Sequence, residues 1–263
     1  MTRRAPDGTG FDLTGPADAP VLALIHGLGL ARGVWDGLLP ALAGYRVLNY
    51  DLYGHGQSGP PPHEASLRVY ADQLAGLMDH VGVERAAVLG FSIGGMINRR
   101  FALDHGARVS ALVILNSPHD RGETAQKTVE ARALTVRDQG ALATMDDALR
   151  RWFTPKALAE GGCAARVRAW RTKVDAESYA QAAWVLANGV RELISADPPI
   201  RAPTLVMTCE NDSGSTPKMG HAIAAEIAGG ECEIVPQYQH LGLMEAPEAF
   251  APAISRFLER TLR

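Results

Sequence analysis

The sequence predicts an α/β fold, a mostly parallel sheet with helices on both faces. Two observations lead to it. Short apolar runs alternate with helix-like stretches along the chain, and one apolar run ends in a Gly-x-Ser-x-Gly turn. Alternating strands and helices form parallel sheets, because each connecting helix packs back onto the sheet. With 263 residues, the chain can bury a large core as one α/β domain with an insertion, or as two domains.

Six apolar runs are predicted strands because aliphatic and β-branched residues fill them. They are Val21–Ile25, Val47–Tyr50, Ala87–Leu89, Ala111–Leu115, Thr204–Thr208 and Glu233–Val235. Helical spacing is found over Leu67–Val81, Ile93–Asp104 and His221–Ile227, and a last helix is expected to start near Pro247. The first twenty residues are rich in Gly, Pro and Asp, so we expect poor strands there.

The alternation stops between about Ser117 and Ile200. That stretch is rich in Ala, Arg, Leu and Trp at helical spacing, and it is too long for an ordinary connection. We therefore expect a core formed by residues 1–116 and 201–263, with residues 117–200 inserted as a helical cap. The cap would lie over the carboxyl edge of the sheet, where such folds bind ligands. A second helical domain unrelated to any pocket is the alternative.

Composition argues against several classes of function. The chain is 46% hydrophobic and 21% charged, with a net charge of -3, whereas a nucleic-acid binder normally shows a basic face. No apolar stretch has the length of a signal-peptide core at the N-terminus or of a membrane span elsewhere. The three scattered cysteines fit no zinc or disulfide pattern, which predicts a reducing cytoplasm. We expect no metal or cofactor, and no nucleic-acid or membrane partner.

The segment Ala86–Ile97 predicts a strand, a sharp turn and a helix around Ser92. In that context Gly90-x-Ser92-x-Gly94 is a nucleophile elbow rather than a glycine-rich turn with an incidental serine. The turn strains the backbone at Ser92, and side chains at Gly90 or Gly94 would collide where strand and helix pack. The elbow would hold the serine hydroxyl at the top of the sheet, beside helix N–H groups that favour negative charge.

A serine nucleophile needs a base, and the base needs an orienting group. In this kind of fold the chain order is serine, then acid, then histidine. Asp212 follows one predicted strand, and His240 lies near the tip of the loop after the next. Alone, an Asx turn and a solvated loop histidine are the alternatives. Together and in this order, the residues predict a triad of Ser92, Asp212 and His240.

Two backbone N–H groups form the predicted oxyanion hole. One belongs to Ile93, directly after the serine, and the other to Leu28, in the glycine-rich loop after the first predicted strand. His26, in the same loop, is interpreted as a packed structural histidine rather than a second base. Asn116 follows the strand after the elbow, where some relatives of this fold place the acid. An amide cannot compensate an imidazolium, which favours Asp212.

With these residues assembled, the chain resembles the α/β-hydrolase superfamily from about Val21 to its end. The matching segments are His26-Gly27, Asp51-Leu52-Tyr53-Gly54-His55-Gly56-Gln57-Ser58, Gly90-Phe91-Ser92-Ile93-Gly94-Gly95, Asp212, His240 and Glu245-Ala246-Pro247-Glu248-Ala249-Phe250. The resemblance implies the α/β-hydrolase fold with its cap. It also implies that the loop of Asp51 is structural rather than catalytic.

Within the superfamily the chain is most similar to 3-oxoadipate enol-lactonases and carboxylesterase-like members. The similarity rests on the elbow through Met96-Ile97, on Arg151-Trp152-Phe153-Thr154-Pro155, on Asp175–Ala180, and on Arg191-Glu192-Leu193. Two positions depart from the family pattern. Cys209 stands where glycine usually precedes the acid, and Gln239 replaces the commoner glycine before the histidine. These departures leave the substrate open.

The resemblance implies a serine hydrolase that cleaves a small carboxylic ester or lactone through an acyl-enzyme. A general carboxylesterase, a cofactor-free perhydrolase and a non-catalytic ligand-binding protein of the same fold are the alternatives. An enol lactone that carries a carboxylate would need a cation in its pocket. The candidates are Arg32, Arg150, Arg151 and Lys156, with Trp152 as a wall, and a solvated helix face is the alternative for all of them. The oligomeric state, a homo-oligomer included, stays open.

Overall fold

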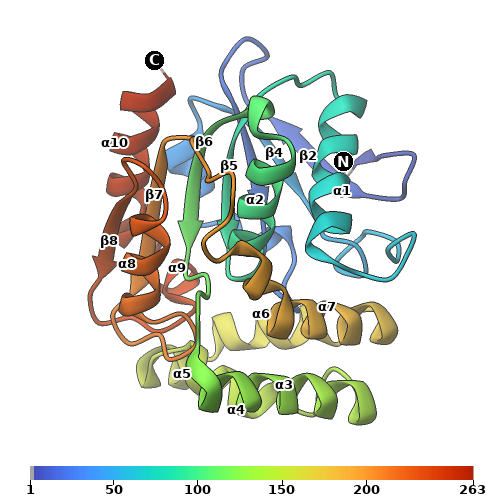
Figure 1. The fold of residues 1–263 in the computed structure, drawn as a ribbon. Coiled ribbons are helices and arrows are strands. Elements are labelled where there is room, and N and C mark those ends of the chain that lie inside the picture. Colours follow the sequence, from blue (N-terminus) through green and yellow to red (C-terminus); the bar gives the residue numbers. More distant parts are fainter. Residues whose placement is uncertain (1–2, 263) are drawn as a thin grey trace.

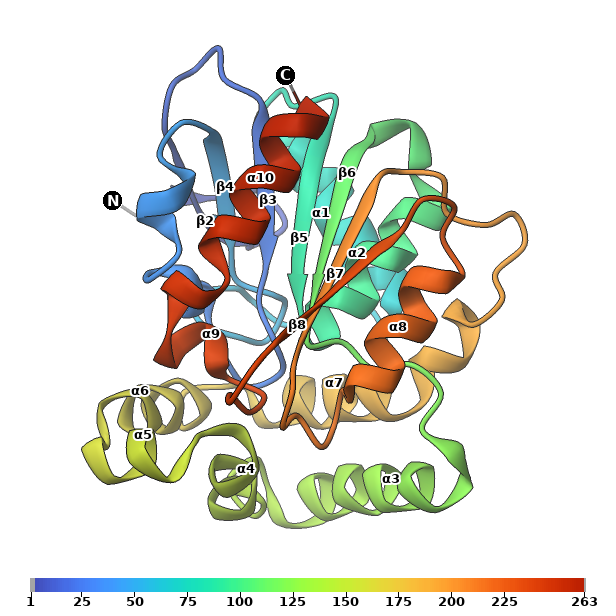
Figure 2. The same cartoon turned by 90° about the vertical axis from the view of Figure 1, so that its left-hand side faces the viewer.

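The computed structural model describes residues 3–262, which contain one eight-stranded sheet with helices on both faces (Figures 1 and 2). The strand order is β1-β2-β4-β3-β5-β6-β7-β8. Strands β3 to β8 are parallel to one another, whereas β2 pairs antiparallel with both β1 and β4. The strands are β1 Arg3–Arg4, β2 Gly10–Thr14, β3 Val21–Ile25, β4 Arg46–Tyr50, β5 Ala86–Phe91, β6 Val109–Leu115, β7 Thr204–Cys209 and β8 Glu231–Val235.

All six predicted strands are present, several of them longer by one or two residues at an end. The expectation of poor strands near the N-terminus is wrong for β2, in which four of five residues form a regular antiparallel ladder with β4. Phe11 of β2 lies opposite Tyr50, and both side chains are buried. Strand pairing and the burial of Phe11 outweigh the weak local preference of a segment rich in Gly, Pro and Asp.

Two hydrophobic cores lie on the two faces of the sheet, because successive strand residues point in opposite directions. On β3, Ala23 and Ile25 belong to the core under α1, α2 and α8, whereas Leu22 and Leu24 belong to the core under α10. These helices are α1 Leu67–His80, α2 Ile93–Asp104, α8 Pro217–Ala225 and α10 Ala251–Leu262. The central strand β5 is buried throughout, as its unbroken apolar sequence requires.

Two helix boundaries differ from the sequence prediction. Helix α8 begins at Pro217 rather than near His221, because the Thr216 side chain accepts a hydrogen bond from the N–H of Met219 and caps the helix earlier. The helix expected from Pro247 starts as a 3-10 turn over Pro247–Ala249 and continues as α10 after Phe250. The short helix α9, Gly242–Glu245, precedes both.

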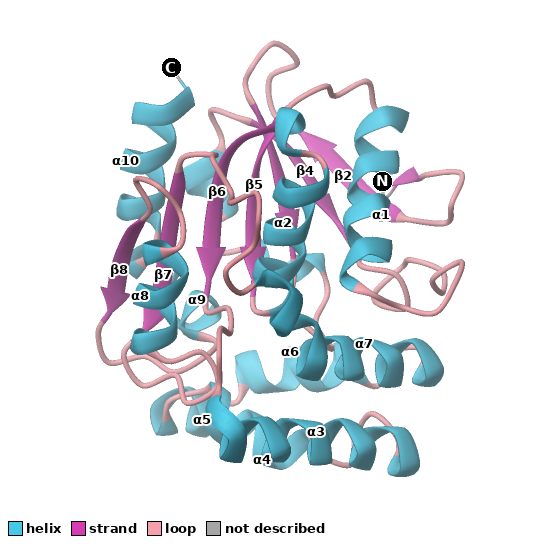
Figure 3. Cartoon of the chain, viewed as in Figure 1, coloured by secondary structure: helices cyan, strands magenta, loops and turns pink. Residues whose placement is uncertain are grey.

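Residues 117–200 form helices and loops without a strand, as their spacing predicts (Figure 3). The helices are α3 Gly122–Gln139, α4 Met145–Trp152, α5 Pro155–Glu160, α6 Gly162–Arg171 and α7 Ala176–Asn188, followed by a 3-10 turn over Gly189–Leu193. They lie together beyond the end of the sheet toward which the arrows of β5 and β6 point (Figure 1). None of the helices in residues 3–262 has both the length and the apolar character needed to cross a membrane.

Candidate active site

The chain turns sharply at Ser92, between β5 and α2. Its φ of 58° and ψ of -116° place it in a backbone region that side chains other than glycine rarely adopt. A Cβ at Gly90 would lie 2.1 Å from the carbonyl oxygen of Gly94, and one at Gly94 would lie 2.3 Å from that of Ile25. Neither contact is sterically possible, so this turn requires glycine on both sides of the serine.

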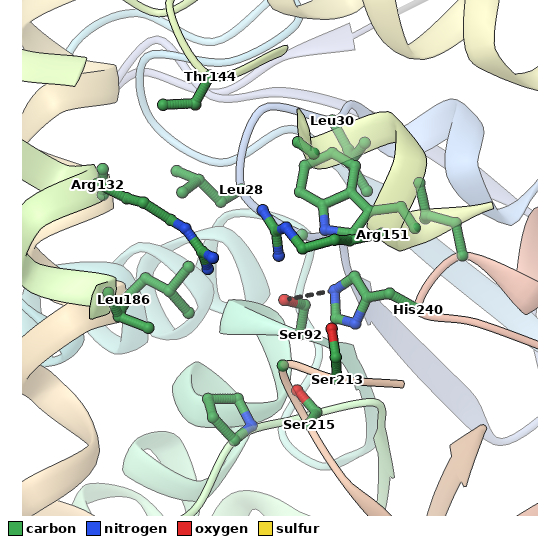
Figure 4. A pocket seen from close by; sticks show the side chains of 18 of the residues that line it. Leu28, Leu30, Ser92, Arg132, Thr144, Arg151, Leu186, Ser213, Ser215 and His240 are labelled. Atoms are coloured by element: carbon green, nitrogen blue, oxygen red, sulfur yellow. Dashed lines mark hydrogen bonds between the residues drawn. The ribbon is translucent and has the colours of Figure 1, made fainter. Parts of the chain in front are cut away.

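His240 lies within hydrogen-bond distance of both Ser92 and Asp212, so the three residues form a hydrogen-bonded series. His240 Nε2 is 3.1 Å from Ser92 Oγ (Figure 4), and His240 Nδ1 is 2.6 Å from Asp212 Oδ2. Because the carboxylate can only accept, Nδ1 carries the proton, and Nε2 accepts the hydrogen bond of the serine hydroxyl. The three residues follow β5, β7 and β8, whose carboxyl ends meet at one edge because these strands are parallel.

Both oxygens of the Asp212 carboxylate accept hydrogen bonds. Its Oδ1 accepts hydrogen bonds from the N–H groups of Gly214 and Ser215, at 2.8 and 2.9 Å. Its Oδ2 accepts from the Asn116 amide at 2.9 Å as well as from His240. Burial by itself would raise the pKa of Asp212, but the charge and hydrogen bond of His240, with the bonds from Asn116 and Ser215, hold it below its usual value. The aspartate therefore stays ionised beside the histidine.

The N–H groups of Leu28 and Ile93 are both free of a hydrogen-bond acceptor within residues 3–262. Ile93 is the first residue of α2, so no carbonyl lies one turn before it in the helix. Leu28 lines the same cavity as Ser92 (Figure 4). Among the described residues, both backbone donors are therefore left without a hydrogen-bond partner.

Two buried histidines hold the loop of Leu28. His26 donates from Nδ1 to the Gly27 carbonyl at 2.8 Å, and its Nε2 accepts the N–H of Leu52 at 2.9 Å. His55 donates to the Tyr53 carbonyl, and its Nε2 accepts the N–H of Gly29 at 3.0 Å. Burial lowers the pKa of His26, and burial together with the neighbouring His26 lowers that of His55 to about 3. Both rings are neutral structural groups, as the sequence predicts for His26.

A cavity opens above Ser92, with about 950 Å³ of empty space that is partly open to solvent. Its floor consists of residues that follow the strands, and its roof belongs to α3, α4, α6 and α7. Apolar side chains form much of the wall, and they include Leu28, Leu30, Phe91, Val129, Val136 and Leu186. Four arginines also line it: Arg121, Arg132, Arg151 and Arg171.

The residues predicted for the substrate pocket divide into two groups. Arg151 and Trp152 line the cavity, and the Trp152 ring lies 5.9 Å from the His240 ring, centroid to centroid. The prediction for Arg32 is wrong. It is absent from the cavity wall and instead forms ion pairs with Asp51 and with Asp12. Asp12 belongs to β2, a strand that the sequence does not predict, so the ion pair of Arg32 with Asp12 could not be predicted either.

The other two cations proposed for the pocket lie on solvent-exposed helix faces instead. Arg150 is exposed and pairs with Asp147 three residues earlier on α4. The Lys156 side chain is 86% exposed and lies 3.9 Å from Glu160. Each therefore has a partner on its own helix, away from the cavity.

Sequence reasoning missed Arg121, Arg132 and Arg171. For Arg132 a signal exists: at helical spacing it shares a face with Val129 and Val136, both of which line the cavity. An arginine on an apolar helix face is a candidate for a buried or ligand-facing position. Arg171 carries no comparable local signal, because its burial results from α6 packing between Trp152 and Tyr179.

The family model described as alpha/beta hydrolase fold matches residues 20–247. The chain belongs to this family. It is 28% identical, over 91% of its length and 90% of the relative's, to an (E)-2-((N-methylformamido)methylene)succinate hydrolase from Acinetobacter baylyi. It is 27% identical to 3-oxoadipate enol-lactonase 2 of the same organism, over 94% of this chain and 91% of that protein.

A solved structure extends the likeness to three dimensions. The enol-lactonase from Burkholderia xenovorans superposes with a TM-score of 0.86 at 28% identity, covering 95% of this chain and 96% of that one. The α/β-hydrolase fold expected from the sequence is therefore confirmed, and so is the resemblance to enol-lactonases.

Proposed function

We propose that this hydrolase-family protein is a serine hydrolase that cleaves a small carboxylic ester or lactone through an acyl-enzyme. The hydrogen-bonded series Ser92, His240 and Asp212 carries the proposal. His240 Nε2 takes the hydroxyl proton as Ser92 Oγ attacks the substrate carbonyl, and Asp212 offsets the charge of the imidazolium. The N–H groups of Leu28 and Ile93 stabilise the oxyanion of the tetrahedral intermediate.

The second half of the reaction uses the same groups. His240 gives its proton to the leaving alkoxide or enolate, which departs and leaves Ser92 acylated. Water then enters, His240 removes a proton from it, and the resulting tetrahedral intermediate collapses to free the acid and Ser92. The 3-oxoadipate enol-lactonases among the relatives support an ester or lactone substrate.

We also assign residues 117–200 as a cap on a core formed by residues 1–116 and 201–263. Support comes from the cavity itself, since Arg151, Trp152 and Leu186 of the inserted helices line it together with Ser92. A roof of this kind excludes water from the acyl-enzyme and supplies contacts that select the substrate.

Ser92→Ala tests the proposal. The variant should lose at least about three orders of magnitude in kcat on esters and lactones, because the nucleophile is gone while binding groups stay. The wild type should be labelled at Ser92 by a fluorophosphonate probe, and the variant should not. Unchanged circular dichroism and Tm would show that the fold is intact. Turnover near the wild-type rate in the variant, or no labelling of the wild type, would overturn the serine mechanism.

A further inference from the structure

Three arginines face the cavity without an acidic partner. They are Arg132 on α3, Arg151 on α4 and Arg171 at the end of α6. Within the part of the chain that the structure describes, none of their guanidinium groups forms an ion pair or donates a hydrogen bond. Arg121 differs, because it donates to the carbonyl oxygens of α7 residues Leu186 and Ala187. Three cations of the roof therefore have unused donors.

Arg171 is the most deeply placed of the three. Its side chain is 2% exposed, and its Nε and one terminal nitrogen are buried without an acceptor. The guanidinium carbon lies 4.9 Å from the Trp152 ring centroid and 5.2 Å from that of Tyr179. The rings attract the cation through their faces, but they accept no conventional hydrogen bond. Burial lowers the pKa of Arg171, which reflects the cost of a guanidinium without a counter-ion.

Arg132 and Arg151 form a second group of positive charge. Figure 4 shows both side chains extending into the cavity on the side of Ser92 that faces the inserted helices. Burial and then the charge of Arg132 lower the pKa of Arg151, so the two guanidinium groups lie close enough to repel. Asp212 is the single carboxylate among the residues that line the cavity, and it is already bonded to His240. One substrate carboxylate would leave most of this charge uncompensated.

We propose that the substrate is an ester or lactone that carries two carboxylates. Arg171 holds one of them beside Trp152, and Arg132 with Arg151 holds the other. A guanidinium binds a carboxylate through two parallel N–H bonds, which fixes its orientation as well as its charge. Apolar walls such as Leu28 and Val136 would contact the carbon chain between the two anions. The inference rests on the serine-hydrolase proposal and names the substrate class of that site.

A series of monoethyl esters of small aliphatic acids tests the number of carboxylates. The series consists of ethyl butyrate, monoethyl succinate and the terminal monoethyl ester of tricarballylate, which carry zero, one and two free carboxylates. Hydrolysis is followed by pH-stat at constant ionic strength. We expect kcat/KM to rise about tenfold or more with each carboxylate, because charge-assisted hydrogen bonds are strong in a partly buried site. Equal or better turnover of the neutral ester would overturn the proposal.

Single substitutions then assign the sites. Arg171→Met and Arg151→Met should each lower kcat/KM for the dianionic ester at least about tenfold, and for ethyl butyrate less than about threefold. Arg171→Lys should restore part of the loss, since it keeps the charge without the planar fork. Arg150→Met is the matched control, because Arg150 is the exposed neighbour of Arg151 on the same helix and pairs with Asp147. An equal loss on all three esters would show that Arg171 acts only in folding, contrary to the proposal.

A binding measurement keeps the test independent of catalysis and of the arginine variants. Calorimetry of the Ser92→Ala protein, which does not hydrolyse the esters, should show the tricarballylate monoethyl ester binding at least about tenfold more tightly than monoethyl succinate, and ethyl butyrate more weakly than either. Equal affinities would overturn the inference. The two proposals fail differently: turnover that survives Ser92→Ala removes the serine mechanism, whereas a serine hydrolase that prefers neutral esters removes only the dianionic substrate.

Discussion

The floor and the roof of the cavity satisfy their polar groups in opposite ways. On the floor, the Asp212 carboxylate accepts four hydrogen bonds, and both ring nitrogens of His26 and of His55 are used. On the roof, Arg132, Arg151 and Arg171 have no acceptor among the described residues. These side chains of the floor are therefore held in place before substrate arrives, as preorganised catalysis requires. Under the proposed substrate class, a ligand would supply the acceptors that the roof lacks.

The largest loss of kcat is expected from a substitution of Asp212, the acid in the floor of the cavity. Asp212→Asn places an amide where the histidine needs an acceptor, so the imidazole loses its orientation and charge compensation. We expect kcat to fall about 10³- to 10⁴-fold. Glu210→Gln is the control, because this nearby exposed acid bonds the N–H of Gln237 instead of the triad. Steady-state kinetics on one ester measures both variants, and a loss below tenfold in Asp212→Asn would contradict the role given to this residue.

A smaller loss of activity is expected from a substitution of Asn116, which holds Asp212 in place through a hydrogen bond. Asn116 donates to the same Asp212 oxygen that His240 bonds, and its φ of 47° is one that glycine adopts without strain. Asn116→Gly removes the hydrogen-bond donor, and glycine can adopt the same backbone conformation. The variant should lower kcat/KM about tenfold.

The kinetic parameters separate positioning from folding in this variant. A positioning role lowers kcat while KM stays within about twofold and the protein remains folded at the assay temperature. If kcat is unchanged, the fourth hydrogen bond of Asp212 is unimportant, and the contrast between floor and roof is weaker than the geometry suggests.

The smallest effect concerns stability of the floor against acid. His55 has a pKa of about 3 in the folded protein, compared with 6.5 for a free histidine, and burial lowers that of His26 as well. Below about pH 6.5 the unfolded chain binds protons that the folded protein excludes. The free energy of unfolding should therefore fall as pH drops from 6.5 toward 3, by up to about 1.4 kcal/mol per pH unit for His55, and the lowered pKa of His26 acts in the same direction.

Urea unfolding at pH 7.5, 6 and 5 checks this dependence. His55→Gln should flatten the slope, because an amide can donate to Tyr53 and accept from Gly29 without titrating. His63→Asn serves as the control, since His63 is exposed. Identical slopes in the wild type and His55→Gln would mean that His55 protonates in the folded state.

Local sequence predicts the features that short-range sterics and strand order control. The elbow follows from Gly90, Ser92 and Gly94, because the turn excludes side chains on either side of the serine. The meeting of Ser92, Asp212 and His240 follows from their positions after parallel strands, whose carboxyl ends share one edge. The helical nature of residues 117–200 follows from their spacing.

Tertiary packing decides which charges are paired. Sequence alone offers Arg32, Arg150 and Arg151 as equivalent candidates, yet the first pairs with Asp12 and Asp51 and the second with Asp147. Arg171 becomes important only because α6 carries it between two aromatic rings. Counter-ions and burial depend on residues far away in the chain. The sequence by itself thus predicted that Ser92, Asp212 and His240 meet, whereas the folded chain decided which cations face the cavity.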